Sequence, residues 1–264
     1  MEDCLGQNYA LRYVTAILPM SAPTTSSAKV SGWSSDRRFY TGVAIGTALI
    51  IFVGFAQTYY LKLLFGTPQL RLLLHIHGLV MSAWFVLFFV QVRLVAAHRT
   101  DLHRRLGVVG AVLAGLAVVV GTRVALSQGH LHLIQNEVSI EPPLVLLPVT
   151  LGTLLLFASF VTAAILLRRR ADYHKRLMVL ACLSILLPGI DRLPLHSIEI
   201  AERSTLFGLN DLCFAICIAY DTFKNRRLHP AWVWGGALVV GLQILTLMIS
   251  HTPSWTRIAE WILK

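Results

Sequence analysis

Ten histidines stand in this sequence, and six of them fall at the same end of a series of apolar segments. A neutral imidazole is a good ligand for iron, copper and zinc, and a carboxylate complements it. The candidate metal ligands are His77, His130, His132, His196 and His251. These residue types at one depth predict a site for a haem or a transition metal, with a redox role.

A second group of polar residues interrupts the apolar segments themselves. Ionisable and amide side chains are costly inside a bilayer, so by default they mark a binding site or a buried pair. The candidate cofactor-binding residues are His77, Trp84, Gln91, Arg192, Asn210 and Asp211. Placed by depth at about 1.5 Å per residue, the polar groups cluster in the outer half of the predicted bundle. The inner half is expected to be almost wholly apolar.

His77 begins a regular stripe along one segment. His77, Trp84 and Gln91 recur every seven residues, which places them on one face of a helix. His75 lies two residues earlier, roughly 200° around the same helix, so the two histidines cannot face one point. We therefore expect His77 to point into the bundle and His75 to point away from it.

Each candidate also has a purely structural interpretation. His77 would then only bond a neighbouring helix, and the loop histidines would be solvated. Arg192 would pair with Asp211 inside the bundle or with Asp191 at its rim, and either pairing offsets charge burial without chemistry. Asp221, near the other end of its segment, is expected to be a solvated helix cap.

Four further histidines, His98, His103, His174 and His229, stand among arginines and lysines. Two of them share the pattern D-x-H-[RK]-R-L, which occurs at 101–106 and again at 172–177, with a looser copy at 226–230. The favoured interpretation is contact with lipid phosphates or capping of helix starts, and a haem or metal site is the alternative. The recurrence indicates related helical hairpins, as in proteins built from parallel repeats.

The composition sets the fold class that must position these residues. Of 264 residues, 56% are hydrophobic and 14% are charged, whereas a soluble domain carries about 25% charged residues. These values exclude a soluble globule, a disordered chain and a nucleic-acid-binding domain. We predict an all-α membrane protein with seven transmembrane helices. They are expected near 39–62, 70–95, 104–127, 143–167, 174–194, 204–222 and 231–251.

The chain has a net charge of +10, and its basic residues are distributed unevenly between the two sides of the predicted bundle. Sixteen Lys and Arg residues fall in the N-terminal tail and in three connections, and seven fall on the other side. The positive-inside rule then predicts a cytoplasmic N-terminus and a C-terminus outside. The end of the bundle with these three connections is called the basic end below.

Three regions follow from this division. Residues 1–38 form a polar tail whose true start is expected at Met20, 39–251 form the seven-helix bundle, and 252–264 form a short interfacial tail. Tryptophans near predicted span ends are expected to anchor in the membrane interface. They are Trp232, Trp234, Trp255 and Trp261.

Several phrases of this sequence carry a resemblance. They are Leu74-His-Ile-His-Gly78, Trp84 through Gln91, the two D-x-H-[RK]-R-L copies and Leu228-His-Pro-Ala-Trp232. Together, over roughly residues 39 to 262, the chain resembles a family of uncharacterised bacterial inner-membrane proteins with several spans. The resemblance implies the bacterial inner membrane, but no catalytic residues, cofactor or ligand.

Two classes of function remain open on the sequence alone. The first is a redox protein that binds haem or a transition metal near the outer face. The second is a protein without catalysis, either a small-solute transporter or an accessory subunit of a membrane complex, in which the same polar groups bind solute or join helices. The expected partners are the lipid bilayer and, for an accessory subunit, another membrane subunit, and not nucleic acid.

Overall fold

The computed structural model describes residues 27–135, 143–193 and 203–263. The chain divides into two compact units, residues 1–38 and 39–264. In the first unit the described residues, 27–38, are helical. All packing considered below lies within the second unit.

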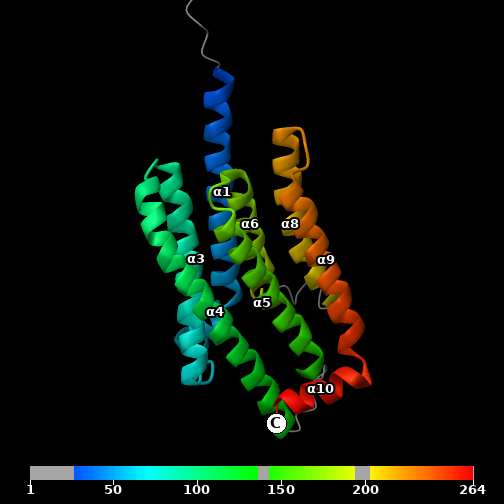
Figure 1. Cartoon of the computed structure of the whole chain (residues 1–264). Coiled ribbons are helices and arrows are strands. Elements are labelled where there is room, and N and C mark those ends of the chain that lie inside the picture. The colour runs from blue at the N-terminus through cyan, green and yellow to red at the C-terminus, as the bar shows by residue number, and fades with distance from the viewer. Residues whose placement is uncertain (1–26, 136–142, 194–202, 264) are drawn as a thin grey trace, which may run out of the picture. The chain divides into compact units, whose positions relative to one another are not determined.

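The described residues form helices and no strand, which confirms the predicted all-α class (Figure 1). Two short elements, the π-helical turn η1 and the helix α2, follow the first long helix. The elements are α1 (Ser27–Gly54), η1 (Ala56–Tyr60), α2 (Lys62–Phe65), α3 (Leu72–Ala96), α4 (Thr100–Gln135), α5 (Pro143–Leu166), α6 (Ala171–Ser184), α7 (Leu187–Asp191), α8 (Arg203–Asn225), α9 (Pro230–Ser250) and α10 (Pro253–Leu263).

Six helical segments among the described residues are long and apolar enough to cross a membrane, so the chain is a multi-pass membrane protein. They are Asp36–Gly54, Leu72–Ala96, Thr100–Leu131, Leu146–Leu166, Ala171–Asp191 and Pro230–Ser250. The remaining predicted span coincides with α8, which is 23 residues long but is not among the six.

The helices of the second unit pack in a chain of neighbours. α3 lies beside α4, α4 beside α5, and α5 also contacts α6 and α9 (Figure 1). The best-enclosed side chains come from α5 and α6, including Phe157, Leu180 and Leu183. Large apolar side chains on the outside, such as Leu79 and Val86 of α3, are exposed, as expected for helices that face lipid.

The three basic connections meet at one end of the bundle. The His103 ring at the start of α4 lies beside the His174 ring at the start of α6. Asp172 of α6 in turn bonds His229, the residue before α9. The arrangement follows from antiparallel neighbours joined by short loops, and it agrees with the charge pattern from which the basic end was predicted.

The fifth predicted span is broken just before Pro188 and Gly189, a pair of residues that disfavours a continuous helix. α6 ends at Ser184 and α7 begins at Leu187, directly before Pro188 and Gly189. Gly54, at the end of α1, lies against the backbone of Gly189. If Gly54 carried a Cβ atom, that atom would overlap the carbonyl oxygen of Gly189. Glycine at both positions therefore allows α1 and α7 to approach by their backbones.

The C-terminal tail forms an amphipathic helix, α10, that crosses the ends of α4 and α5 (Figure 1). Ala259 and Leu263 are buried against this surface, and the indole of Trp255 donates to the carbonyl of Leu144 at 2.7 Å. Trp261 is 78% exposed, which suits an interfacial anchor. Trp232 differs from the expectation, because it is fully buried rather than at the interface.

Candidate functional site

The inward face of α3 carries polar atoms that are buried without partners. Nδ1 of His77, Nε1 of Trp84 and Oε1 of Gln91 have no hydrogen-bond partner among the described residues. His75 is exposed and His77 is half-buried, in agreement with the orientation that the helical spacing predicts. We call these three residues the α3 polar face.

The three members of the α3 polar face are too far apart to satisfy one another. Steps of seven residues separate them by about 10 Å along the helix axis, several times the length of a hydrogen bond. The Trp84 ring packs edge-on against Phe157 of α5, with ring centroids 4.8 Å apart. The Trp84 side chain also interacts with the thiol of Cys182 on α6. The polar atoms of His77 and Gln91 therefore require a partner other than the described side chains, such as water or a ligand.

Arg192 lies at the end of the bundle opposite to the basic end, which is also the end of the α3 polar face that carries His77. Its positive charge acts through space on the His77 ring. Its guanidinium donates to the carbonyl of Pro188, lies 4.9 Å from the ring centre of Phe55, and pairs with Asp191 at 3.6 Å. The pairing of Arg192 with Asp191 at the rim is thus present.

Asp211 and Asn210 lie on α8, and the side-chain bond of Asp211 is to Gln243 rather than to Arg192. The side-chain amide of Gln243 on α9 donates to Asp211 at 2.8 Å, which joins α8 to α9. Asn210 is buried, and its Oδ1 has no partner among the residues described. Four of the six candidate cofactor-binding residues, Asn210 and the α3 polar face, therefore carry an unpartnered buried polar atom.

The candidate metal ligands do not converge in the described part of the chain. Nδ1 of His130 lies 2.6 Å from the carbonyl oxygen of Leu263, and His251 is exposed at the end of α9. The side chain of His132 and the whole of His196 lie outside the described residues. Within the described residues, no three His, Cys, Asp or Glu side chains are grouped so that they would hold a metal ion.

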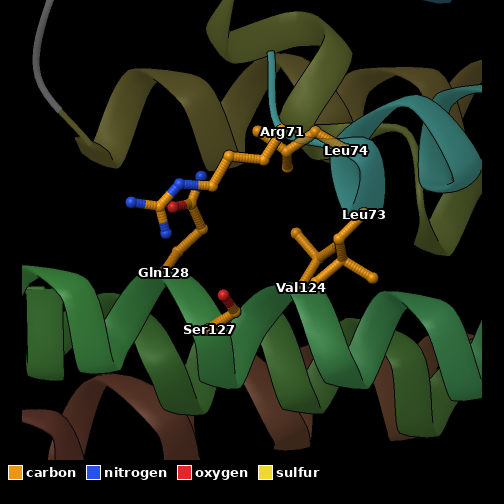
Figure 2. A pocket seen from close by; sticks show the side chains of 6 residues that line it. All are labelled: Arg71, Leu73, Leu74, Val124, Ser127 and Gln128. Carbon is orange, nitrogen blue, oxygen red and sulfur yellow. The ribbon is translucent and has the colours of Figure 1, made fainter.

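A small hollow lies between the start of α3 and the outer half of α4 (Figure 2). Its lining residues are Arg71, Leu73, Leu74, Val124, Ser127 and Gln128. Figure 2 shows the Arg71 side chain extended across the hollow towards Gln128. None of the candidate site residues lines it, so the hollow is separate from the α3 polar face.

The most enclosed charges in the described residues lie at the basic end. Arg176 of α6 is 4% exposed and Asp221 of α8 is 3% exposed. Nε and Nη2 of Arg176 donate to the two carboxylate oxygens of Asp221, both at 2.8 Å. Such a two-bond pair has the geometry that best compensates for burial of both charges.

Two further donors complete the bonding of Asp221. The indole of Trp232 on α9 donates to Asp221 at 3.0 Å, and the amide of Asn225 donates to it at 3.1 Å. Two sequence predictions are therefore wrong: Asp221 is not a solvated cap, and the inner half of the bundle is not almost wholly apolar. Asp221 joins α6, α8 and α9 into one network.

His229 extends this arrangement towards the surface. Its Nε2 lies 3.1 Å from the Asp172 carboxylate, while its Nδ1 accepts from the main-chain amide of Ala231 at 3.1 Å. The predicted role in capping a helix start is confirmed for this histidine, since α9 begins at Pro230. The sequence signal that hinted at the whole network is the D-x-H-[RK]-R-L copy, which supplies both Asp172 and Arg176.

Replacement of Trp232 by phenylalanine tests the indole bond to Asp221. The ring stays, but the carboxylate loses one donor, so we expect the free energy of unfolding to fall by about 1–3 kcal/mol. Unfolding of the detergent-solubilised protein by a denaturing detergent, followed by circular dichroism, measures the change. Trp234→Phe is the matched control, because Trp234 is exposed; equal losses in the two variants would refute the role of the bond.

The sequence matches no family model, and no curated protein or solved structure matches the chain. The functional conclusion therefore depends on the geometry of the α3 polar face and of the basic end.

Proposed function

We propose that this multi-pass membrane protein conducts protons, or a small polar solute, along the α3 polar face. The observation that carries the proposal is the line of buried polar atoms on His77, Trp84 and Gln91, of which those on His77 and Gln91 have no partner among the described residues. An unpartnered polar atom in hydrocarbon is costly, and polar groups inside a membrane bundle commonly mark a pathway. Water or solute along this face would supply the missing bonds.

The length of the α3 polar face supports a pathway more than a compact site. From His77 to Gln91 the helix rises by about 21 Å, which is most of the thickness of a bilayer's hydrocarbon core. At the basic end of the α3 polar face, the main chain of Gln91 makes a hydrogen bond with the His103 ring. At the opposite end, the positive charge of Arg192 acts through space on His77. A single metal ion would use only one point of such a line.

Proton flux into proteoliposomes tests this function. The purified chain is reconstituted, a potassium diffusion potential is applied, and the internal pH is followed with a trapped dye. We expect flux above that of empty liposomes, reduced at least about tenfold by His77→Ala, by analogy with lost relay groups. His75→Ala is the matched control, because His75 is exposed to the outside of the same helix turn. Flux equal to that of empty liposomes would contradict proton conduction.

The proposed placement follows the charge pattern. We propose seven spans with α8 as the sixth, a cytoplasmic basic end, and residence in a bacterial inner membrane. The meeting of the three basic connections at one end supports the orientation. The length of α8, 23 residues, and its hydrogen bond to α9 through Asp211 support its place as a span.

A second candidate function is redox chemistry with a haem or a transition metal bound at His77. The observation that favours it is the half-buried imidazole of His77, which has a ring nitrogen without a partner among the described residues. Purified protein would then show a Soret band or bound metal that disappears in His77→Ala. A colourless protein without bound metal, with normal folding of that variant, would reject this candidate.

A further inference from the structure

We propose that His103 and His174, together with Gln91, form a binding site for a divalent first-row transition metal at the basic end. This site is distinct from the outer group of histidines that the sequence indicated. It does not rest on the proposed function, although it shares Gln91 with the α3 polar face, because zinc content is measured without any flux and the two proposals can fail separately.

The positions of the two histidines follow from the repeated motif. His103 is the fourth residue of α4, and His174 is the fourth residue of α6. Both helices begin at the basic end and run in the same direction, so equal offsets bring the two imidazoles to the same level. α5 packs against both α4 and α6. The His103 and His174 rings consequently lie next to each other.

The separation of the rings suits one shared ion. Their centroids are 6.1 Å apart, with the planes at 85°. A metal–nitrogen bond of about 2.0–2.1 Å allows two imidazoles on one ion to have centroids about 5–6 Å apart. Only a small movement of exposed helix starts is required to reach this geometry.

The His174 ring is already held as a ligand would be. Its Nδ1 lies 2.8 Å from the main-chain carbonyl oxygen of Ala164, so Nδ1 carries the proton and donates. The lone pair of the neutral ring is then on Nε2. Metal-binding histidines almost always donate their other ring nitrogen to a carbonyl or carboxylate in this way.

The other two ligands have unused atoms. Nδ1 of His103 and Oε1 of Gln91 are buried without partners among the described side chains. The Gln91 amide lies against the same stretch of α4, because a Cβ added to Gly107, one turn after His103, would be 3.8 Å from its Nε2. Two imidazoles and an amide oxygen are ligands that zinc, copper and iron accept.

The charged side chains near this site do not occupy the ligand atoms of His103, His174 and Gln91. Asp172 is engaged by His229, and the Lys175 ammonium lies 5.2 Å from the centre of the Tyr40 ring. Arg104, beside His103 in sequence, is exposed. The ion would therefore be held by neutral ligands and would reach them from the basic end.

Zinc binding to the purified full chain tests the site. The protein is stripped with a chelator, equilibrated with Zn²⁺, desalted and assayed by elemental analysis. We expect about one zinc per chain in the wild type and at least a fivefold lower content in His103→Gln and His174→Gln. His75→Gln and His251→Gln, which replace exposed histidines, are expected to keep the wild-type content.

Co²⁺ provides a second readout, because its visible absorption reports the ligand geometry and not only the content. If His174→Gln fails to fold through loss of the Ala164 bond, His103→Gln decides the question. Nδ1 of His103 has no partner among the described residues, and the ring's main-chain bond is to Gln91, which the glutamine side chain amide can also make. Wild-type protein without bound zinc, or variants at 103 with unchanged zinc content and cobalt spectrum, would overturn the proposal.

Discussion

Asp221→Asn is expected to lower the free energy of unfolding by about 3–5 kcal/mol, because it leaves the Arg176 guanidinium buried without a counter-charge. Both side chains are almost fully enclosed, and the carboxylate receives two bonds from Arg176 and one from Trp232. Asparagine keeps the shape but removes the charge and replaces one acceptor by a donor. Denaturation of the detergent-solubilised protein, followed by circular dichroism, measures the loss.

Two controls separate charge burial from a general sensitivity of the bundle. Asp191→Asn removes an exposed carboxylate whose contact with Arg192 is 3.6 Å long, and we expect a change within about 0.5 kcal/mol. The double variant Arg176→Met with Asp221→Leu removes both charges and should recover most of the loss of the single variant. A double variant as unstable as Asp221→Asn would contradict the ion-pair explanation.

Gly54→Ala is expected to disrupt the contact of α1 with α7 and to cost about 3 kcal/mol, the upper part of the range for overpacked cores. The added methyl group would overlap the carbonyl of Gly189, which is backbone and cannot rotate away. In turn, Gly189 is packed against Ile51, so neither helix has room to withdraw without losing its own contacts. The same denaturation assay reports the effect.

Gly46→Ala is the matched control for the α1 contact. Gly46 lies in the same helix, and nothing lies within 4 Å of an added Cβ. Because alanine is favoured over glycine in a helix by about 0.5–1 kcal/mol, this variant should be neutral or slightly more stable. If Gly54→Ala were as stable as Gly46→Ala, the close approach of α1 and α7 would be refuted.

The elements and the orientation of α3 were predictable from the sequence for a clear physical reason. Long apolar segments between basic connections indicate transmembrane helices. The seven-residue recurrence of His77, Trp84 and Gln91 specifies one face of a helix, whatever its neighbours are. The kink before Pro188 likewise depends only on local backbone chemistry.

The partners across helices were not predictable in the same way. Arg176 and Asp221 are 45 residues apart, and their contact depends on how α8 packs against α6. Depth along α6 and α8 was estimated from the sequence, but the rotation of these two helices about their own axes was not. Asp221 was therefore assigned to solvent by its place near a helix end, although it faces the interior.

The outer histidines illustrate the same limit. His130 and His251 fall at similar depths in the sequence, yet His130 contacts Leu263 of α10 and His251 is exposed after α9. Two residues at the same depth need not be close together. His130 lies on α4 and His251 follows α9, so their separation depends on where these two helices stand in the bundle. In contrast, His103 and His174 share both the depth and the neighbourhood, since the motif repeats at the start of nearby helices.

The most direct measurement of the central claim is the accessibility of the α3 polar face to water. Single cysteines are introduced as His77→Cys, Leu79→Cys and Val86→Cys in a chain without its native cysteines, and labelled with a charged thiol reagent. Leu79 and Val86 are 67% and 63% exposed on the outside of α3, where they face lipid. We expect fast labelling at position 77 and slow labelling at positions 79 and 86. Labelling at position 77 that is equally slow or slower would show that water does not reach the α3 polar face.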